Sequence, residues 1–99
     1  MEHPSKHPLY STWSLMIARC HDPRNISFVD YGARGIFVCD RWRLGEGNRD
    51  GFECFVDDMG ERPEKMTLDR RENAGPYSHD NCRWATKEQQ IANRGGKPP

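Results

Sequence analysis

The chain has 99 residues and a formal net charge of zero at pH 7, which suits one domain, or one domain with a small extension. Leu, Ile, Val and Phe total only 15 residues, but zero net charge excludes the strongly charged composition of a disordered chain, so we expect a small core rich in aromatic side chains. The sequence holds no secretory segment and no apolar run near 18 residues, so we expect a soluble, cytoplasmic protein that does not enter a membrane.

The first predicted element is a helix that follows an irregular tail over residues 1–8. Five apolar residues recur at helical spacing and are expected to face the core: Leu9, Trp13, Met16, Ile17 and Cys20. Ser11 or Thr12 is the expected N-cap, and Pro23 is expected to end the helix.

The next segment, residues 22–35, is rich in turn-forming residues. Two glycines flank Arg34, so the backbone can approach a partner closely there. Arg34 is therefore either a contact to DNA phosphate or a solvated side chain of a plain turn. Residues 35–39 are predicted as a short strand, with Trp42 packing just beyond it. Arg41, beside that Trp, has the same two interpretations as Arg34.

A second helix is predicted between Asp50 and Gly60. Asp50 and Glu53 have the spacing of a capping box, and Gly60 is expected to end the helix in a left-handed conformation. Four apolar residues share one helical face: Phe52, Phe55, Val56 and Met59. The acids are interpreted as the solvated side of the helix, with metal ligation as the alternative: Glu53, Asp57 and Asp58.

Residues 67–94 have the order strand, polar loop, strand, short helix. Asp69 ends the first predicted strand, Asn81 opens the second, and Asn93 lies on the helix, predicted from about Lys87 to Arg94. That helix has a capping box of its own, Thr86 with Gln89, and a stop at Gly95-Gly96.

Cysteine and arginine usage limits the partners. The four cysteines form no close C-x-x-C pair, so reduced thiols are expected and a structural Zn²⁺ site is not. Zero net charge argues against a strong nonspecific DNA binder. Eleven of the fifteen basic residues are Arg, however, and Arg grips phosphate in two-pronged geometry, so a locally positive face remains open.

The segment LDRRENAGPYSHDNCRWAT, followed by KEQQIANR, resembles a phage group of the HNH endonucleases with the pattern LDRIDNNGxYSPENCRWAT and a helix that ends in Asn. Weaker matches occur upstream, in the order YGARGI, VCDRW and DMGERP. The sequence departs from the family where many members carry a His general base directly after the metal-binding residue, because Arg70 follows Asp69 here.

The resemblance implies an α+β fold with a ββα-metal unit in residues 66–95. Residues 1–65 would be an N-terminal extension of helices and a short strand, with packing and DNA-binding roles, and residues 96–99 a flexible tail. The chain would be a metal-dependent DNA endonuclease from a phage or mobile element. It would act in the host cytoplasm, either nicking as a monomer or cutting both strands as a homodimer.

The resemblance also implies the site residues. Asp69 and Asn93 would bind Mg²⁺ or Mn²⁺, since both offer hard oxygen ligands; a surface Asp and an ordinary helical Asn are the plain alternatives. Asn81 would hold the loop through hydrogen bonds to its backbone. Arg70 would clamp phosphate, and four arginines are candidate DNA contacts: Arg34, Arg41, Arg70 and Arg83.

Two residues compete as the general base. Tyr77 lies in the loop expected to cover the metal, and Arg70 and the metal would have to lower the pKa of its phenol from about 10. His79 is the rival, because an imidazole changes charge near neutral pH without help; packing of Tyr77 in the loop is the third interpretation. The missing His also motivates a catalytically degenerate DNA-binding module as an alternative function. A phage packaging or structural accessory protein is the other.

Overall fold

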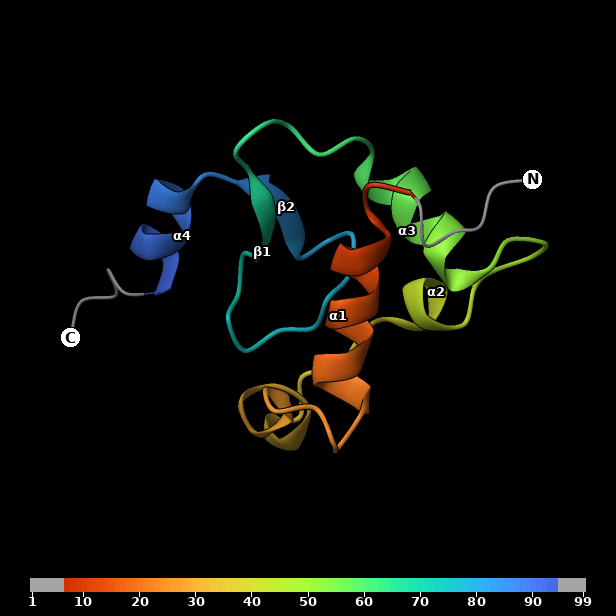
Figure 1. The fold of residues 1–99 in the computed structure, drawn as a ribbon, viewed down its shortest axis with the longest axis horizontal. Coiled ribbons are helices and arrows are strands. Elements are labelled where there is room, and N and C mark those ends of the chain that lie inside the picture. Colours follow the sequence, from red (N-terminus) through yellow and green to blue (C-terminus); the bar gives the residue numbers. More distant parts are fainter. Residues whose placement is uncertain (1–6, 95–99) are drawn as a thin grey trace.

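The computed structural model describes residues 7–94, without the side chains of the last two. The first six residues of the tail predicted over 1–8, the predicted helix stop at Gly95-Gly96 and the predicted tail at 96–99 lie outside the described residues. The elements are, in chain order, α1 (Tyr10–His21), the short 3-10 helices η2 (Phe28–Asp30) and η3 (Gly32–Arg34), α2 (Asp40–Arg43), α3 (Gly51–Met59), β1 (Thr67–Arg70), β2 (Cys82–Ala85) and α4 (Lys87–Arg94) (Figure 1). The α+β class is confirmed. No helix within residues 7–94 has the length and apolar character needed to cross a membrane.

Helix α1 carries the predicted apolar stripe, with Met16 and Cys20 buried. The predicted N-caps are wrong, because the helix begins at Tyr10 and its N-cap, Leu9, makes no side-chain capping bond. Leu9 is instead buried in the core, and its N–H donates to Nδ1 of His7 at 3.0 Å. Apolar packing, not a hydroxyl cap, therefore marks the start of α1.

The strand predicted at residues 35–39 does not form. Only Val38 makes a bridge, in parallel fashion, to Tyr77, and α2 begins two residues later. Tyr77 N–H donates to the carbonyl of Phe37, and Cys39 N–H donates to the carbonyl of Tyr77, both at 2.9 Å. These two bonds attach the segment before α2 to the loop between β1 and β2.

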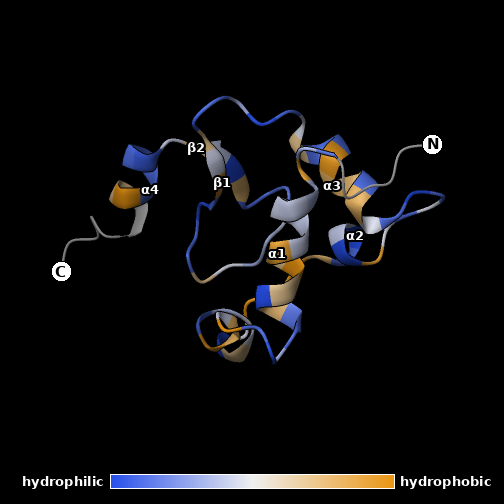
Figure 2. Cartoon of the chain, in the orientation of Figure 1, coloured by the Kyte–Doolittle hydropathy of each residue, from blue (hydrophilic) through white to orange (hydrophobic). Residues whose placement is uncertain are grey.

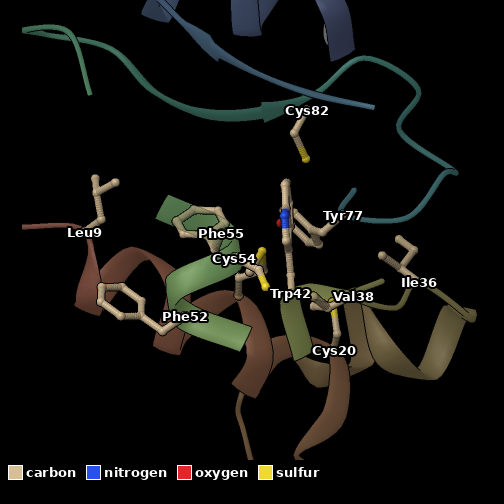
Figure 3. Packing of buried hydrophobic residues seen from close by; sticks show 11 residues of the cluster. Leu9, Cys20, Ile36, Val38, Trp42, Phe52, Cys54, Phe55, Tyr77 and Cys82 are labelled. Carbon is tan, nitrogen blue, oxygen red and sulfur yellow. The ribbon is translucent and has the colours of Figure 1, made fainter. Parts of the chain in front are cut away.

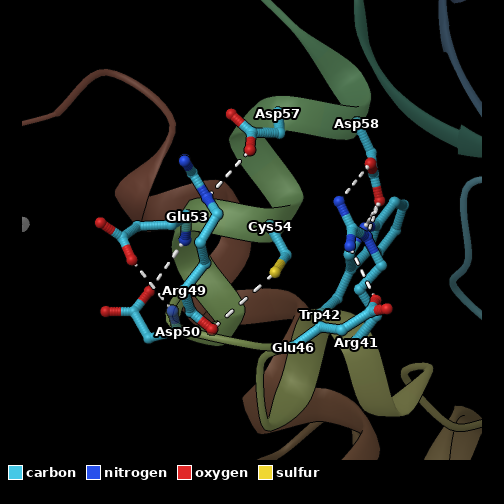
Figure 4. A network of polar contacts seen from close by, with 9 residues as sticks. All are labelled: Arg41, Trp42, Glu46, Arg49, Asp50, Glu53, Cys54, Asp57 and Asp58. Carbon is cyan, nitrogen blue, oxygen red and sulfur yellow. Dashed lines mark hydrogen bonds and ion pairs between the residues drawn. The ribbon is translucent and has the colours of Figure 1, made fainter.

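Helix α3 has the predicted capping box between Asp50 and Glu53, and Gly60 follows it with φ +67°. The expectation that its acids are all solvated is wrong for Asp58, whose side chain is only 15% exposed. Asp58 accepts hydrogen bonds from Arg41 Nε at 2.8 Å and from Trp42 Nε1 at 2.7 Å (Figure 4). These bonds lower the pKa of its carboxyl.

Strands β1 and β2 form an antiparallel pair that places Asp69 opposite Arg83. Helix α4 has the predicted bounds and the predicted cap, in which Gln89 N–H donates to Thr86 Oγ1 and Thr86 N–H donates to Gln89 Oε1. It extends away from the sheet in Figure 1. Its Gln90 side chain nevertheless returns to the hairpin, since Nε2 donates to the carbonyl of Ala85 at 3.2 Å.

The core joins the helical half of the chain to the hairpin (Figure 3). Trp42 and Phe55 pack edge to face, with ring centroids 4.9 Å apart, and Tyr77 and Cys82 enter the same cluster from the C-terminal half. Trp84 Nε1 donates to the carbonyl of Met59 at 2.8 Å, so β2 is also tied to the end of α3. The expected aromatic core is confirmed, and the connecting loops are largely hydrophilic (Figure 2).

All four cysteines are free thiols, as predicted. Cys20, Cys54 and Cys82 are buried and Cys39 is partly buried. Burial raises the pKa of Cys82 to about 12, so this thiol stays protonated and packs as a small apolar side chain.

Candidate functional site

A cleft of about 850 Å³ lies between α1, the 3-10 helices, β1 and α4. Its charged lining residues are four arginines and two aspartates: Arg19, Arg34, Arg62, Arg70, Asp30 and Asp69. These residues define what we call the arginine cleft. Its formal charge is positive by two, although the whole chain is neutral. A neutral protein therefore has a locally positive concave surface, which suits an anionic ligand.

Asp69 reaches the cleft from the middle of β1. Its side chain is 13% exposed, and its Oδ2 accepts a hydrogen bond from Nε of Arg83 at 3.2 Å. The two residues are direct partners in the antiparallel register, so strand pairing sets this contact. Arg83, a predicted DNA contact, therefore pairs with the Asp69 carboxylate and orients it.

Asn81 ties the two ends of the β1–β2 loop together. Its Oδ1 accepts from Glu72 N–H at 2.9 Å, and its Nδ2 donates to the carbonyls of Pro76 at 2.9 Å and Glu72 at 3.2 Å. Gly75 passes so close that an added Cβ would lie 2.8 Å from the Asn81 amide. Asn81 therefore satisfies loop backbone groups, which would otherwise lack partners.

Arg70 also shapes this loop. Its Nη1 donates to the carbonyl of Gly75 at 3.0 Å and to the carbonyl of Asn73. The same guanidinium lies 5.1 Å from the ring centroid of Tyr77 and 5.5 Å from that of Tyr31. Arg70 therefore donates hydrogen bonds to the loop backbone and also lines the cleft.

Tyr77 lines the cleft but is almost wholly buried, with 4% exposure. Its ring stacks on Tyr31, with centroids 6.4 Å apart and an interplanar angle of 22°. Burial raises the pKa of Tyr77 to about 12, against the opposing influence of Arg19 and Arg70. Arg70 alone therefore does not bring the pKa of this phenol below its ordinary value, and a lowering by Arg70 together with a metal stays a prediction.

Arg34 lines the cleft, but Arg41 and His79 do not. Arg41 makes ion pairs with Asp58 and Glu46, both at 2.8 Å, and these raise its pKa. His79 is exposed, and its imidazole helps to lower the pKa of the same Asp58. These contacts define a second charged region, which we call the Asp58 cluster: Arg41, Trp42, Glu46 and Asp58.

The lining residues that sequence reasoning missed include Arg19, Tyr31 and Arg62. Arg19 lies beside Cys20 at the edge of the apolar face of α1, and its guanidinium is 4.8 Å from the Tyr31 ring centroid. Helical spacing could have placed Arg19 at that edge, but it could not show which loop lies opposite. The contact between α1 and the 3-10 segment is a tertiary contact, which helical spacing does not specify.

The donor set for a metal is small. No group of three or more His, Cys, Asp or Glu side chains in the described part of the chain could hold a metal ion. Asp69 offers one carboxylate at the cleft, and Asn93 lies on α4 with its side chain outside the described residues. Only Asp69 is thus a described ligand candidate at the cleft, and a site for Mg²⁺, which commonly keeps several waters and takes substrate phosphate as a further ligand, stays a prediction.

Comparison of the chain with family models, with curated proteins and with solved structures finds no match.

Proposed function

We propose that this protein is a metal-dependent DNA endonuclease of the HNH type, encoded by a phage or mobile element and acting on DNA in the host cytoplasm. One observation carries the proposal: Asp69, on the first strand of a strand–loop–strand–helix unit, borders a concave surface lined by four arginines. A carboxylate beside positive charge is the combination that a cation and a phosphodiester require.

In this proposal Asp69 and Asn93 hold Mg²⁺ or Mn²⁺. The cation, when bound, would offset charge on the phosphate and acidify a water. Arg83 orients the Asp69 carboxylate through the 3.2 Å contact. Asn81 and Arg70 hold the loop that borders the site, and Arg34 and Arg70 face the DNA backbone.

Tyr77 is the candidate base, because it lines the cleft and His79 does not. Its phenol is protonated at neutral pH, so cleavage through Tyr77 should be slow near pH 7 and should accelerate with pH. If Tyr77 is not the base, its ring serves only to pack between Arg70 and Tyr31.

Nicking of supercoiled plasmid tests the proposal. The wild-type protein should convert supercoiled to open-circular plasmid in the presence of Mg²⁺ or Mn²⁺ and should not do so in EDTA. Linear product appearing only at high protein concentration would indicate a homodimer that cuts both strands. Absence of nicking with either metal up to pH 10 would refute an endonuclease function.

A second candidate is a DNA-binding module that has lost cleavage. Two observations favour it: the ion pair that occupies Asp69 and the raised pKa of Tyr77. This candidate predicts DNA binding that is unchanged by EDTA, together with no nicking at any pH. The plasmid assay and a binding assay in EDTA separate the two functions.

A further inference from the structure

Three arginines of the arginine cleft have no carboxylate partner among the described residues. Ion pairs within the described residues involve Arg24, Arg41, Arg49 and Arg83. None of these ion pairs involves Arg19, Arg34 or Arg62. Their guanidinium groups therefore carry positive charge that nothing in the described part of the chain neutralises by direct contact.

The other contacts of these arginines are weak. Nη1 of Arg34 and Nη1 of Arg62 each donate to a backbone carbonyl at 3.4 Å. Arg19 lies over Tyr31 and Tyr77, at 4.8 and 5.8 Å from the ring centroids. A guanidinium over a ring face is positioned by the ring, while its N–H groups still require acceptors.

Arg19 is the most informative of the three. Its Nε is buried and has no hydrogen-bond acceptor among the described residues. Leaving a buried donor unpaired costs free energy, and a missing water or ion is a common reason for such a group. Arg19 is therefore a cation fixed at the wall of a cleft, with hydrogen-bonding capacity that the protein does not use.

We infer that Arg19, with Arg34 and Arg62 of the same cleft, forms a phosphate-binding site for a DNA strand, distinct from the site proposed at Asp69. This inference rests on the proposed function for the choice of DNA as the ligand. Arginine is suited to phosphate because its fork of donors matches two phosphate oxygens. The cleft volume of about 850 Å³ also exceeds the space needed for a single small anion. Arg19 and Asp69 line the same cleft, and in this inference Arg19 positions the strand and takes no part in bond breaking.

Binding measured without metal tests this inference independently of cleavage. The probe is a fluorescein-labelled 20-base-pair duplex in EDTA, followed by anisotropy at several NaCl concentrations. Arg19→Gln should weaken binding by about tenfold and reduce the slope of log Kd against log salt by about one. Arg24→Gln is the matched control, because Arg24 is exposed, follows α1, and pairs with Asp22 away from the cleft. It should leave both quantities unchanged.

A structural role for Arg19 would not change the salt slope, so equal slopes for Arg19→Gln and wild type would overturn the inference. If Arg19→Gln does not fold, NMR of the wild-type protein replaces it. The Nε–Hε signal of Arg19 should shift on titration with the duplex, and that of Arg24 should not. A signal that is unmoved by the duplex, or that saturates with inorganic phosphate but not with the duplex, would also contradict a DNA-strand site. Duplex binding through Arg19 without any plasmid nicking would support this site and refute only the endonuclease.

Discussion

The protein contains two charged regions that use arginine in opposite ways. In the Asp58 cluster, each charged group has a partner within 3.0 Å. In the arginine cleft, Arg19, Arg34 and Arg62 have no ion pair with any described residue. The first arrangement joins α2 to α3, and the second leaves positive charge for a ligand.

The contrast shows why a count of basic residues says little about DNA binding. The sequence makes Arg41 either a DNA contact or a solvated side chain, yet it forms ion pairs with Asp58 and Glu46. Arg19 lies within a helix next to a core cysteine, yet it borders the cleft. Available charge, rather than net charge, should therefore decide where a phosphate binds.

The largest expected effect comes from Asp69→Ala. Removal of the proposed metal-binding carboxylate should lower the plasmid-nicking rate by at least about a hundredfold. The free energy of unfolding should fall less than in Asp58→Ala, because Asp69 makes one ion pair, at 3.2 Å, whereas Asp58 accepts three hydrogen bonds. Asp80→Ala, in an exposed position of the loop between β1 and β2, is the control and should nick normally. Full activity of purified Asp69→Ala would remove Asp69 from the site.

The next effect concerns pH and Tyr77. If the phenolate of Tyr77 is the base, the nicking rate should rise about tenfold per pH unit from pH 7 to 9, because the pKa is about 12 and the active, deprotonated form is far from saturation. Tyr77→Phe should then lose most activity and the pH dependence. A profile that flattens above pH 7.5 and is lost in His79→Ala would assign the base to His79 instead. A normal rate in Tyr77→Phe would leave the ring a packing role.

The Asp58 cluster should respond in stability rather than in activity. Asp58→Ala removes the acceptor for Arg41 and Trp42 and should lower the free energy of unfolding by about 2 kcal/mol. Asp57→Ala is the neighbouring control, since its ion pair with Arg49 is exposed and should contribute less than about 1 kcal/mol. Urea unfolding monitored by Trp fluorescence measures both. Equal losses in the two variants would show that the Asp58 contacts are not structural.

The same carboxyl gives a pH prediction. The pKa of Asp58 is lower in the folded protein than its ordinary value of 3.8. Its contribution to stability is therefore fully present above about pH 4 and is lost as pH falls through the folded-state pKa. Wild type should lose more stability than Asp58→Asn between pH 4 and pH 2.

Asn81→Ala should act through loop geometry. Three hydrogen bonds from Asn81 to the loop backbone disappear, so proteolysis within residues 71–80 should accelerate by about five- to tenfold. Metal affinity, followed by calorimetry with Mn²⁺, should also weaken. Normal metal affinity with a slower chemical step would indicate a direct catalytic role in place of a structural one.

Local features of the fold could be predicted from sequence, and features that depend on tertiary contact could not. The capping boxes at Asp50 and Thr86 and the bounds of α4 are confirmed, because each depends on residues three or four positions apart. The predicted start of α1 is wrong, because burial of Leu9 replaces a polar cap. The predicted strand at 35–39 is wrong, because its backbone pairs at a single point with Tyr77.

The residues of the candidate site also divide into those that the sequence could predict and those that it could not. Asp69 and Arg70 are implied by the resemblance to the HNH endonucleases, and both line the cleft. Arg19 could not be found, since its approach to Tyr31 joins α1 to a segment whose path no periodicity specifies. The ion pair of Arg41 could not be predicted either, because its partner, Asp58, lies 17 residues away in the sequence.

The contrast between the two regions is tested most directly by the salt dependence of duplex binding in EDTA. Wild type should release about 3–5 ions, as expected for a neutral protein with few phosphate contacts. Arg34→Gln should reduce the slope by about one, and Arg41→Gln should leave the slope unchanged while lowering stability. A reduced slope in Arg41→Gln with a normal slope in Arg34→Gln would contradict the assignment of the arginine cleft as the DNA-binding surface.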